Sequence, residues 1–143
     1  MFKKILVWLK NMSIAQKEKD EKINIPKLPA PKFIRDPVHD IIKIEDDVIL
    51  KILNTEPMQR LRFIKQLPLA SYVYPGADHS RLVHSLGVYH LSIKMLNQLD
   101  INNIDEYDRL VIKLAALLHD IGHGPFSHLF ESFLAKVKYR SQE

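Results

Sequence analysis

The sequence contains no cysteine among its 143 residues, which excludes disulfide bonds and thiolate metal ligands. Any metal ion must therefore be held by histidine, by aspartate or glutamate, or by backbone oxygen. Long apolar runs are also missing: the run near the N-terminus, residues 5–9, is too short for a signal-peptide core or a membrane span. We therefore expect a cytoplasmic protein that has no membrane span.

Glycine is scarce. The four glycines stand at positions 76, 87, 122 and 124, all in or beside two histidine-bearing stretches, HSRLVHSLGVYH (79–90) and LLHDIGHGPFSH (117–128). Glycine permits tight turns and close backbone approach. Their clustering indicates specially shaped loops around these histidines.

Positive charge is scarce outside the N-terminal region. Residues 1–35 carry nine Lys/Arg against three Asp/Glu, whereas the rest of the chain carries twelve against fourteen. The net charge of +4 therefore belongs to the N-terminal segment. The body is not a basic platform for nucleic acid, so nucleic-acid binding is not indicated, although the basic segment leaves it open.

The pattern along the chain divides it into two parts. Residues 1–32 read as a basic flexible segment ending in a proline-rich linker, and residues 33–143 read as the folded part. Short alternation near residues 38–46 predicts a small β-hairpin. Helical patterns begin at Val48 and occupy residues 57–64, 80–99, 106–121 and 127–136. The expected fold class is mainly all-α.

Two of these helices are long and strongly patterned. In residues 80–99, a stripe at i, i+4, i+7 and i+11 predicts the buried face: His84, Val88, Leu91 and Met95. The centre of residues 106–121, VIKLAALL, is apolar on nearly all sides, which predicts a helix buried in a bundle. A short connection favours antiparallel packing of the two helices.

The end of the second long helix carries His119 and Asp120. Burying both without partners would cost several kcal/mol, so they must be paired or bind a cation. Adjacent helical residues diverge by roughly 100°, so a metal would need a third ligand, and His84 is the candidate. A hydrogen-bonded core histidine and a helix-end ion pair are the alternatives. His79 and His90 are expected at the surface.

Four segments together carry a resemblance: RDPVHD, QRLRFIKQL, YVYPGADHSRLVHSLGVYHL and LAALLHDIGHGPFSHLFE. Over roughly residues 33 to 134 the chain resembles the HD-domain phosphohydrolase superfamily, and within it the deoxynucleoside triphosphate (dNTP) triphosphohydrolase branch. The resemblance implies a helical bundle around a divalent metal ion, with His84, His119 and Asp120 among its ligands. These ligand types suit Mn, Fe, Mg, Zn or Ni.

The resemblance also implies a nucleotide-binding surface. The arginine matching Arg81 contacts the substrate phosphates in the family, a role that suits its planar guanidinium. Gln66 and Leu67 match positions that line the sugar. The implied substrate is a dNTP.

Three residues after the metal pair match catalytic positions of the family. The histidines matching His123 and His128 reach the phosphates, and the equivalent of His128 is proposed as the general acid for the leaving sugar oxygen. Glu131 would orient His128 or raise its pKa. The alternative for His123 is a helix C-cap.

The implied reaction is hydrolysis of a dNTP to deoxynucleoside and triphosphate. The family pattern needs a further aspartate ligand from a downstream helix, and no aspartate follows Asp120. We therefore expect the N-terminal part only of an HD domain, with low activity as written and with a homo-oligomer as the full-length form. Two alternatives stay open: a phosphohydrolase acting on a monophosphate, cyclic nucleotide or alarmone, and a non-catalytic module that binds nucleotide or oligomerises.

Overall fold

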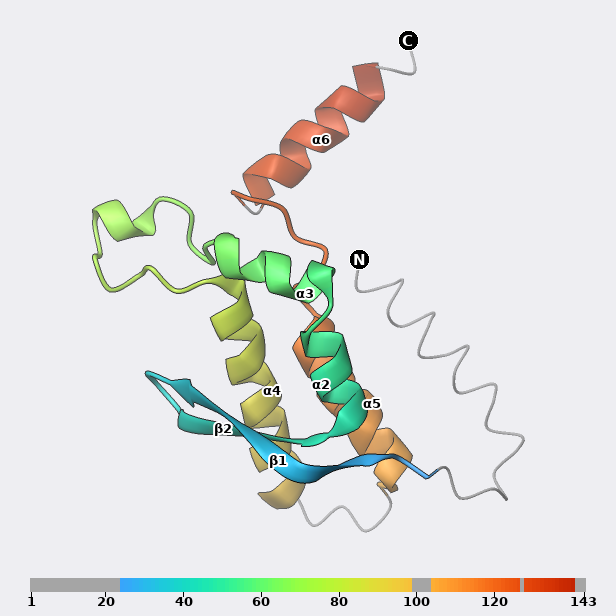
Figure 1. Ribbon diagram of the computed structural model, residues 1–143. Coiled ribbons are helices and arrows are strands. Elements are labelled where there is room, and N and C mark those ends of the chain that lie inside the picture. The colour runs from blue at the N-terminus through green and yellow to red at the C-terminus, as the bar shows by residue number, and fades with distance from the viewer. Residues whose placement is uncertain (1–23, 99–103, 127, 141–143) are drawn as a thin grey trace.

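The computed structural model describes residues 24–98, 104–126 and 128–140, without the side chains of residues 128, 129 and 138–140. Within these ranges the chain is mainly helical, as expected, with one small sheet (Figure 1). The strands are β1 (Lys27–Asp36) and β2 (Asp40–Asp46). The helices are α2 (Asp47–Leu53), α3 (Glu56–Arg60), α4 (Arg81–Gln98), α5 (Glu106–Leu118) and α6 (His128–Arg140), with 3-10 turns η2 (Leu61–Phe63) and η3 (Ala70–Tyr72).

The predicted hairpin is present, and it starts earlier than the alternation indicated. Strand β1 pairs antiparallel with β2 from Lys27 onward, so the last residues of the proposed 1–32 linker are part of the sheet. The register shifts between Lys27 and Lys32, and Pro29 and Pro31 lie inside this irregular stretch. Proline lacks the N–H that a regular ladder needs, so it is tolerated where pairing is interrupted. The polyproline-like composition therefore indicated a linker where a bulged edge strand forms.

The tip of the hairpin packs on α4. Asp36 Oδ1 accepts the backbone N–H groups of Val38 and His39 at 2.9 and 2.8 Å. The ring of His39 lies 5.0 Å from that of His90. His90 is partly buried, whereas the sequence pattern predicted a surface position. A Cβ at Gly87 would lie 3.1 Å from His39 Nε2. A side chain at this position would require the His39 ring to shift by a few tenths of an ångström.

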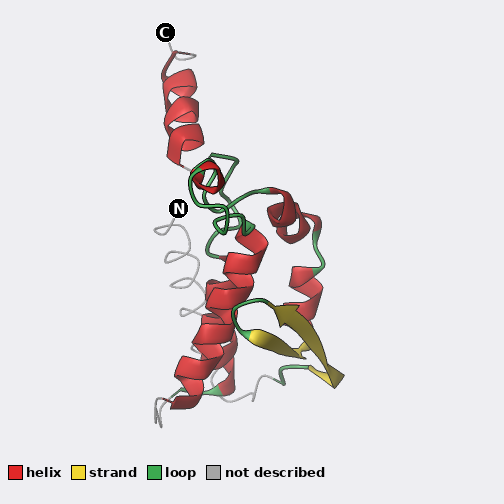
Figure 2. Ribbon diagram, turned by 90° about the vertical axis from the view of Figure 1, so that its left-hand side faces the viewer, coloured by secondary structure: helices red, strands yellow, loops and turns green. Residues whose placement is uncertain are grey.

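Helices α4 and α5 form the antiparallel pair that the short connection predicted, and Figures 1 and 2 show them side by side. The hairpin crosses α4 near its C-terminal half, and α2 and α3 pack beside the pair (Figure 1). The core lies between the hairpin, α2, α3, η2 and α4. Its buried residues are Ile42, Ile44, Ile49, Leu53, Met58, Leu61, Ile64, Leu82, Leu86, Tyr89 and Leu117.

The buried face of α4 differs from the predicted stripe. Leu91 and Met95 are 48% and 59% exposed, whereas Leu82, Leu86 and Tyr89 are buried in the core. Helix α4 carries apolar residues on two overlapping faces, and the hairpin and η2 cover only the second. The stripe prediction was wrong because helical periodicity does not show which face a neighbouring element will cover.

The expectation that the second long helix is buried on all sides is also wrong. In α5 only Leu117 is buried, and Ile112 is 37% exposed. Helix α6 extends away from the α4–α5 pair in both views (Figures 1 and 2), with Phe133 61% exposed. Among the described helices none is long and apolar enough to cross a membrane.

Candidate metal centre

The candidate site forms where the start of α4 meets the end of α5. Arg81 and His84 lie in the first turn of α4. Asp105 is the N-cap of α5, and its side chain accepts the Asp108 N–H at 2.8 Å. The helix ends at Leu118, three residues before the predicted end. His119 is therefore the C-cap of α5. The antiparallel pairing brings this end of α5 beside the first turn of α4.

The turn after α5 carries the motif residues. The Ile121 N–H donates to the Leu118 carbonyl and the His123 N–H to the Asp120 carbonyl, each at 3.1 Å. Asp120 thus lies on a tight turn instead of on the helix. His119 itself keeps helical backbone angles, so the third ligand predicted from the sequence is still needed to close a metal site.

His84, His119 and Asp120 each offer a ligand atom, and these atoms lie within 4.8 Å of one another. His84 Nε2 is 3.1 Å from His119 Nε2. Asp120 Oδ1 is 3.6 Å from His119 Nε2, and Asp120 Oδ2 is 3.9 Å from His84 Nε2. The three residues that we predicted as metal ligands from the sequence therefore lie close together in the structure.

These separations fit one bound cation. Ligand atoms at about 2.1 Å from a common ion lie between roughly 3 Å apart, at a right angle, and about 4.2 Å apart, when opposite. The 3.1 Å between the two imidazole nitrogens and the 3.6 Å from His119 Nε2 to Asp120 Oδ1 fall inside this range. The 3.9 Å from His84 Nε2 is to the other oxygen, Oδ2. Two imidazoles and a carboxylate suit Zn, Fe, Mn or Ni, and with more water ligands Mg.

The protonation of the two histidines also suits a metal. His119 Nδ1 donates to the Ala116 carbonyl at 2.8 Å, which leaves its Nε2 lone pair facing His84. Burial lowers the pKa of His84 below its ordinary value, and Asp120 only partly opposes this effect. His84 is therefore neutral at pH 7, the form that ligates a metal.

Arg81 contributes the strongest charge at the site. Its side chain is 4% exposed, and Nη1 donates to Asp120 Oδ2 at 2.5 Å. A buried arginine beside a buried carboxylate offsets much of the desolvation cost of both groups. The predicted phosphate contact thus lies within the site, where it holds the Asp120 carboxylate.

His123 joins the site from the same turn. Its Nε2 lies 3.5 Å from Asp120 Oδ1, and its Nδ1 lies 2.7 Å from Glu131 Oε1. The prediction paired Glu131 with His128; the described contact of Glu131 is with His123. His128 is the first residue of α6, and its side chain lies outside the described residues. The His123–Glu131 contact spans a loop and a helix start, so no helical spacing could have indicated it.

Gln66 and Leu67, predicted to line the sugar, lie at the start of a loop that returns to α4. The loop is closed at its base: the Arg81 N–H donates to the Ile64 carbonyl at 2.8 Å and the Gln66 N–H to the His79 carbonyl at 3.1 Å. This closure places Gln66 near the N-terminus of α4. Gln66 Oε1 is buried without a hydrogen-bond partner among the described residues, and Leu67 is 45% exposed.

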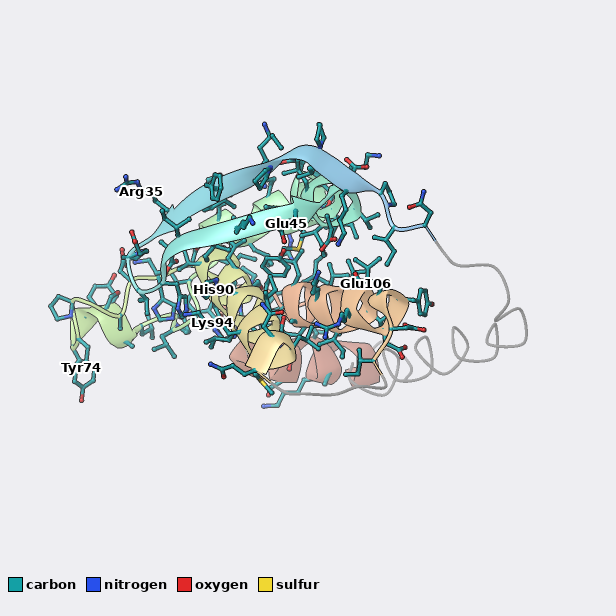
Figure 3. The ribbon with its side chains drawn as sticks, turned by 90° about the horizontal axis from the view of Figure 1, so that it is seen from below. Arg35, Glu45, Tyr74, His90, Lys94 and Glu106 are labelled. Carbon is teal, nitrogen blue, oxygen red and sulfur yellow. The ribbon has the colours of Figure 1, made fainter. Side chains whose placement is uncertain are left out.

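The outer part of this loop is strongly exposed. Tyr74 points away from the body at one extreme of the molecule (Figure 3). Tyr72 and Val73 are 84% and 72% exposed. The loop thus joins a fixed base beside the site to an apolar, exposed tip.

Comparison with known proteins agrees with this geometry. Residues 81–141 match the family described as HD domain. The chain is 44% identical over 104 residues to the deoxynucleoside triphosphate triphosphohydrolase SAMHD1 of Bos taurus, covering 70% of the chain and 18% of that protein. It is 44% identical over 107 residues to the uncharacterized protein YwfO of Bacillus subtilis, covering 73% and 25%.

A solved structure is similar too. The phosphohydrolase BT4208 of Bacteroides thetaiotaomicron superposes with a TM-score of 0.68 at 43% identity, covering 71% of this chain and 26% of that chain. The chain therefore spans about a fifth to a quarter of the length of these relatives.

Proposed function

We propose that the centre of this chain holds a divalent metal ion and serves the hydrolysis of a dNTP to deoxynucleoside and triphosphate, on the basis of the match of residues 81–141 to the HD domain and of the similarity to dNTP triphosphohydrolases. The observation that carries the proposal is the cluster of His84, His119 and Asp120, with ligand atoms within 4.8 Å. The substrate is proposed from the SAMHD1 relatives, which are named as deoxynucleoside triphosphate triphosphohydrolases.

The ligands proposed for the ion are His84, His119 and Asp120. A divalent ion bound there supplies Lewis-acid polarisation of a phosphate oxygen and a more acidic water. Arg81, buried beside Asp120, donates a hydrogen bond to its carboxylate and presents a guanidinium where phosphate charge would develop.

The proposed proton chemistry rests on the histidines of the turn. His123 Nδ1 contacts Glu131 at 2.7 Å, and a carboxylate on one imidazole nitrogen fixes the orientation of the ring. His123 would then contact the phosphates through its other nitrogen. His128, at the start of α6, is proposed as the general acid that protonates the 5′ oxygen of the leaving nucleoside.

The product identifies the reaction. Incubation of the chain with Mn²⁺ and each dNTP, followed by ³¹P NMR, should release inorganic triphosphate and no monophosphate. The same assay with a nucleoside monophosphate, a cyclic nucleotide and a guanosine alarmone covers the other phosphohydrolase reactions. His119→Ala is the matched control, because it removes a ligand and leaves Arg81 and Asp120 in place. Release from the alternative substrates alone would contradict the proposed substrate.

We also propose that the chain assembles with further copies. The support is the exposed apolar surface of Phe63, Leu69, Tyr72 and Val73, which are 88%, 60%, 84% and 72% exposed. Apolar patches of this kind mark interaction surfaces. Light scattering during gel filtration should show a mass above 16.7 kDa, and Tyr72→Ser with Val73→Ser should return it to the monomer value.

A further inference from the structure

Arg60 connects the metal turn to a distant helix. It is the last residue of α3, and its Nη2 donates to the carbonyl oxygens of Ile121 and His123 at 3.1 and 3.0 Å. These two residues lie on either side of Gly122, and the first of them, Ile121, directly follows Asp120. One guanidinium nitrogen, with its two N–H groups, thus serves two carbonyls of the turn.

The turn needs such a donor. The last carbonyl groups of a helix, and those of the turn after it, lack intrahelical partners. Basic side chains near a helix C-terminus can bond these carbonyls and complement the helix dipole. Here the donor comes from α3, more than sixty positions earlier in the sequence, so it also fixes the turn relative to the rest of the fold.

The base of Arg60 is held firmly. Met58, two residues earlier in α3, is fully buried in the core. Gln59 Nε2 donates to the Leu53 carbonyl at 2.7 Å, which ties α3 to the end of α2. The guanidinium is therefore presented from a rigid element, although it is itself accessible to solvent.

We propose that Arg60 is a positioning residue of the metal centre, which holds the turn after α5 so that Asp120 and His123 face His84. This inference rests on the proposed function, because the centre must bind a metal for the positioning to matter. Arg60 itself touches neither the three ligands nor the ion. Lysine keeps the positive charge but not the fixed directions of the two N–H groups on a planar guanidinium nitrogen, so it should replace arginine only in part.

The test compares three variants of the 143-residue chain: Arg60→Gln, Arg60→Lys and the control Arg62→Gln. Arg62 is an equally charged neighbour whose Nε donates to Gln59 Oε1 at 2.6 Å. Co²⁺ is titrated well below the melting temperature and followed by its visible absorption. Arg60→Gln should weaken Co²⁺ binding about tenfold, in line with partners that orient ligands. Arg60→Lys should lose less, and Arg62→Gln should bind as the wild type does.

A purely structural role would lower the melting temperature of Arg60→Gln and leave Co²⁺ affinity unchanged, and that result overturns the proposal. Hydrogen exchange without metal gives a second readout: the His123 amide should exchange faster in Arg60→Gln, and equal rates would also overturn it. A wild-type chain that binds no Co²⁺ contradicts the proposed function instead, while the exchange rates still decide whether Arg60 holds the turn.

Discussion

Among the described residues three aspartates are buried, Asp36, Asp46 and Asp120, and the last two differ in their partners. Asp46, at the end of β2, is 1% exposed and receives hydrogen bonds from Lys113 at 2.8 Å and Lys27 at 2.5 Å. Asp120 is 6% exposed and is surrounded by Arg81 and by the histidines of the site. Both carboxylates are compensated, as burial requires. Only Asp120 has imidazole nitrogens around it.

The difference separates a carboxylate compensated by ammonium groups from one that lies among possible metal ligands. Lys27 and Lys113 are ammonium groups without a free lone pair, so they can neutralise Asp46 but cannot share a metal with it. Their positions, on β1 and α5, tie the hairpin to the helix pair. The imidazoles around Asp120 can donate, accept or ligate. A buried carboxylate therefore indicates a metal site only when its neighbours bring lone pairs.

The largest effect should come from removing a ligand from the cluster of His84, His119 and Asp120. Asp120→Asn removes the anionic ligand, and we expect Co²⁺ or Mn²⁺ affinity to fall by more than about 100-fold. Metal at about 100 times the dissociation constant should stabilise the wild type by about 2.7 kcal/mol. Thermal unfolding with and without metal measures this stabilisation, and adding metal should not raise the melting temperature of Asp120→Asn. A full shift in Asp120→Asn would show that the carboxylate is not a ligand.

Substitution of Asp46 should have the opposite pattern, because it should lower the stability of the fold and leave metal binding unchanged. Asp46→Asn leaves Lys113, whose side chain is 14% exposed, without its anion, and we expect a loss of about 3 kcal/mol in the free energy of unfolding. Urea unfolding measures the loss. The metal-induced shift should persist, because Asp46 offers nothing to the site. Asp47→Asn is the control, since Asp47 pairs with Lys51, which is 75% exposed.

The pH dependence of stability should sharpen the same contrast. Burial alone raises the pKa of Asp46, but the hydrogen bonds from Lys113 and Lys27 outweigh it, so the net pKa lies below its ordinary value. Such a group stabilises the fold fully above its unfolded pKa of about 3.9 and loses this contribution as the pH falls through the lower folded value. The stability difference between wild type and Asp46→Asn should be constant above pH of about 5 and shrink below about 4. A difference that grows in acid would contradict the lowered pKa.

The smallest effect should distinguish the two lysines. Lys113 is 14% exposed and Lys27 is 49% exposed, so solvent screens the second ion pair more strongly. We expect Lys113→Gln to cost about 2 kcal/mol and Lys27→Gln less than about 1 kcal/mol in urea unfolding. Equal losses would mean that exposure does not decide the strength of these pairs.

Some of the fold followed directly from the sequence pattern. The helical spacing after Val48, the proline at position 57 and the apolar run of residues 111–118 indicated α2, α3 and α5, because local periodicity records which residues must be sheltered from water. The ends were less certain: α5 stops at Leu118, before the motif. The strand at Lys27 was hidden by its prolines, which are typical of linkers as well as of edge strands.

The sequence by itself determined the kind of chemistry available. Without cysteine, imidazoles and carboxylates are the side chains that could hold a metal. The motif HDIGHGPFSH together with His84 indicated which of them to expect as ligands. The tertiary structure alone decided how they meet. The antiparallel pairing of α4 and α5 set the 3.1 Å between the two imidazoles, Glu131 came to His123 across a loop, and Arg60 reached the turn from α3. Contacts between residues far apart in the chain depend on packing and loop paths, which no local period records.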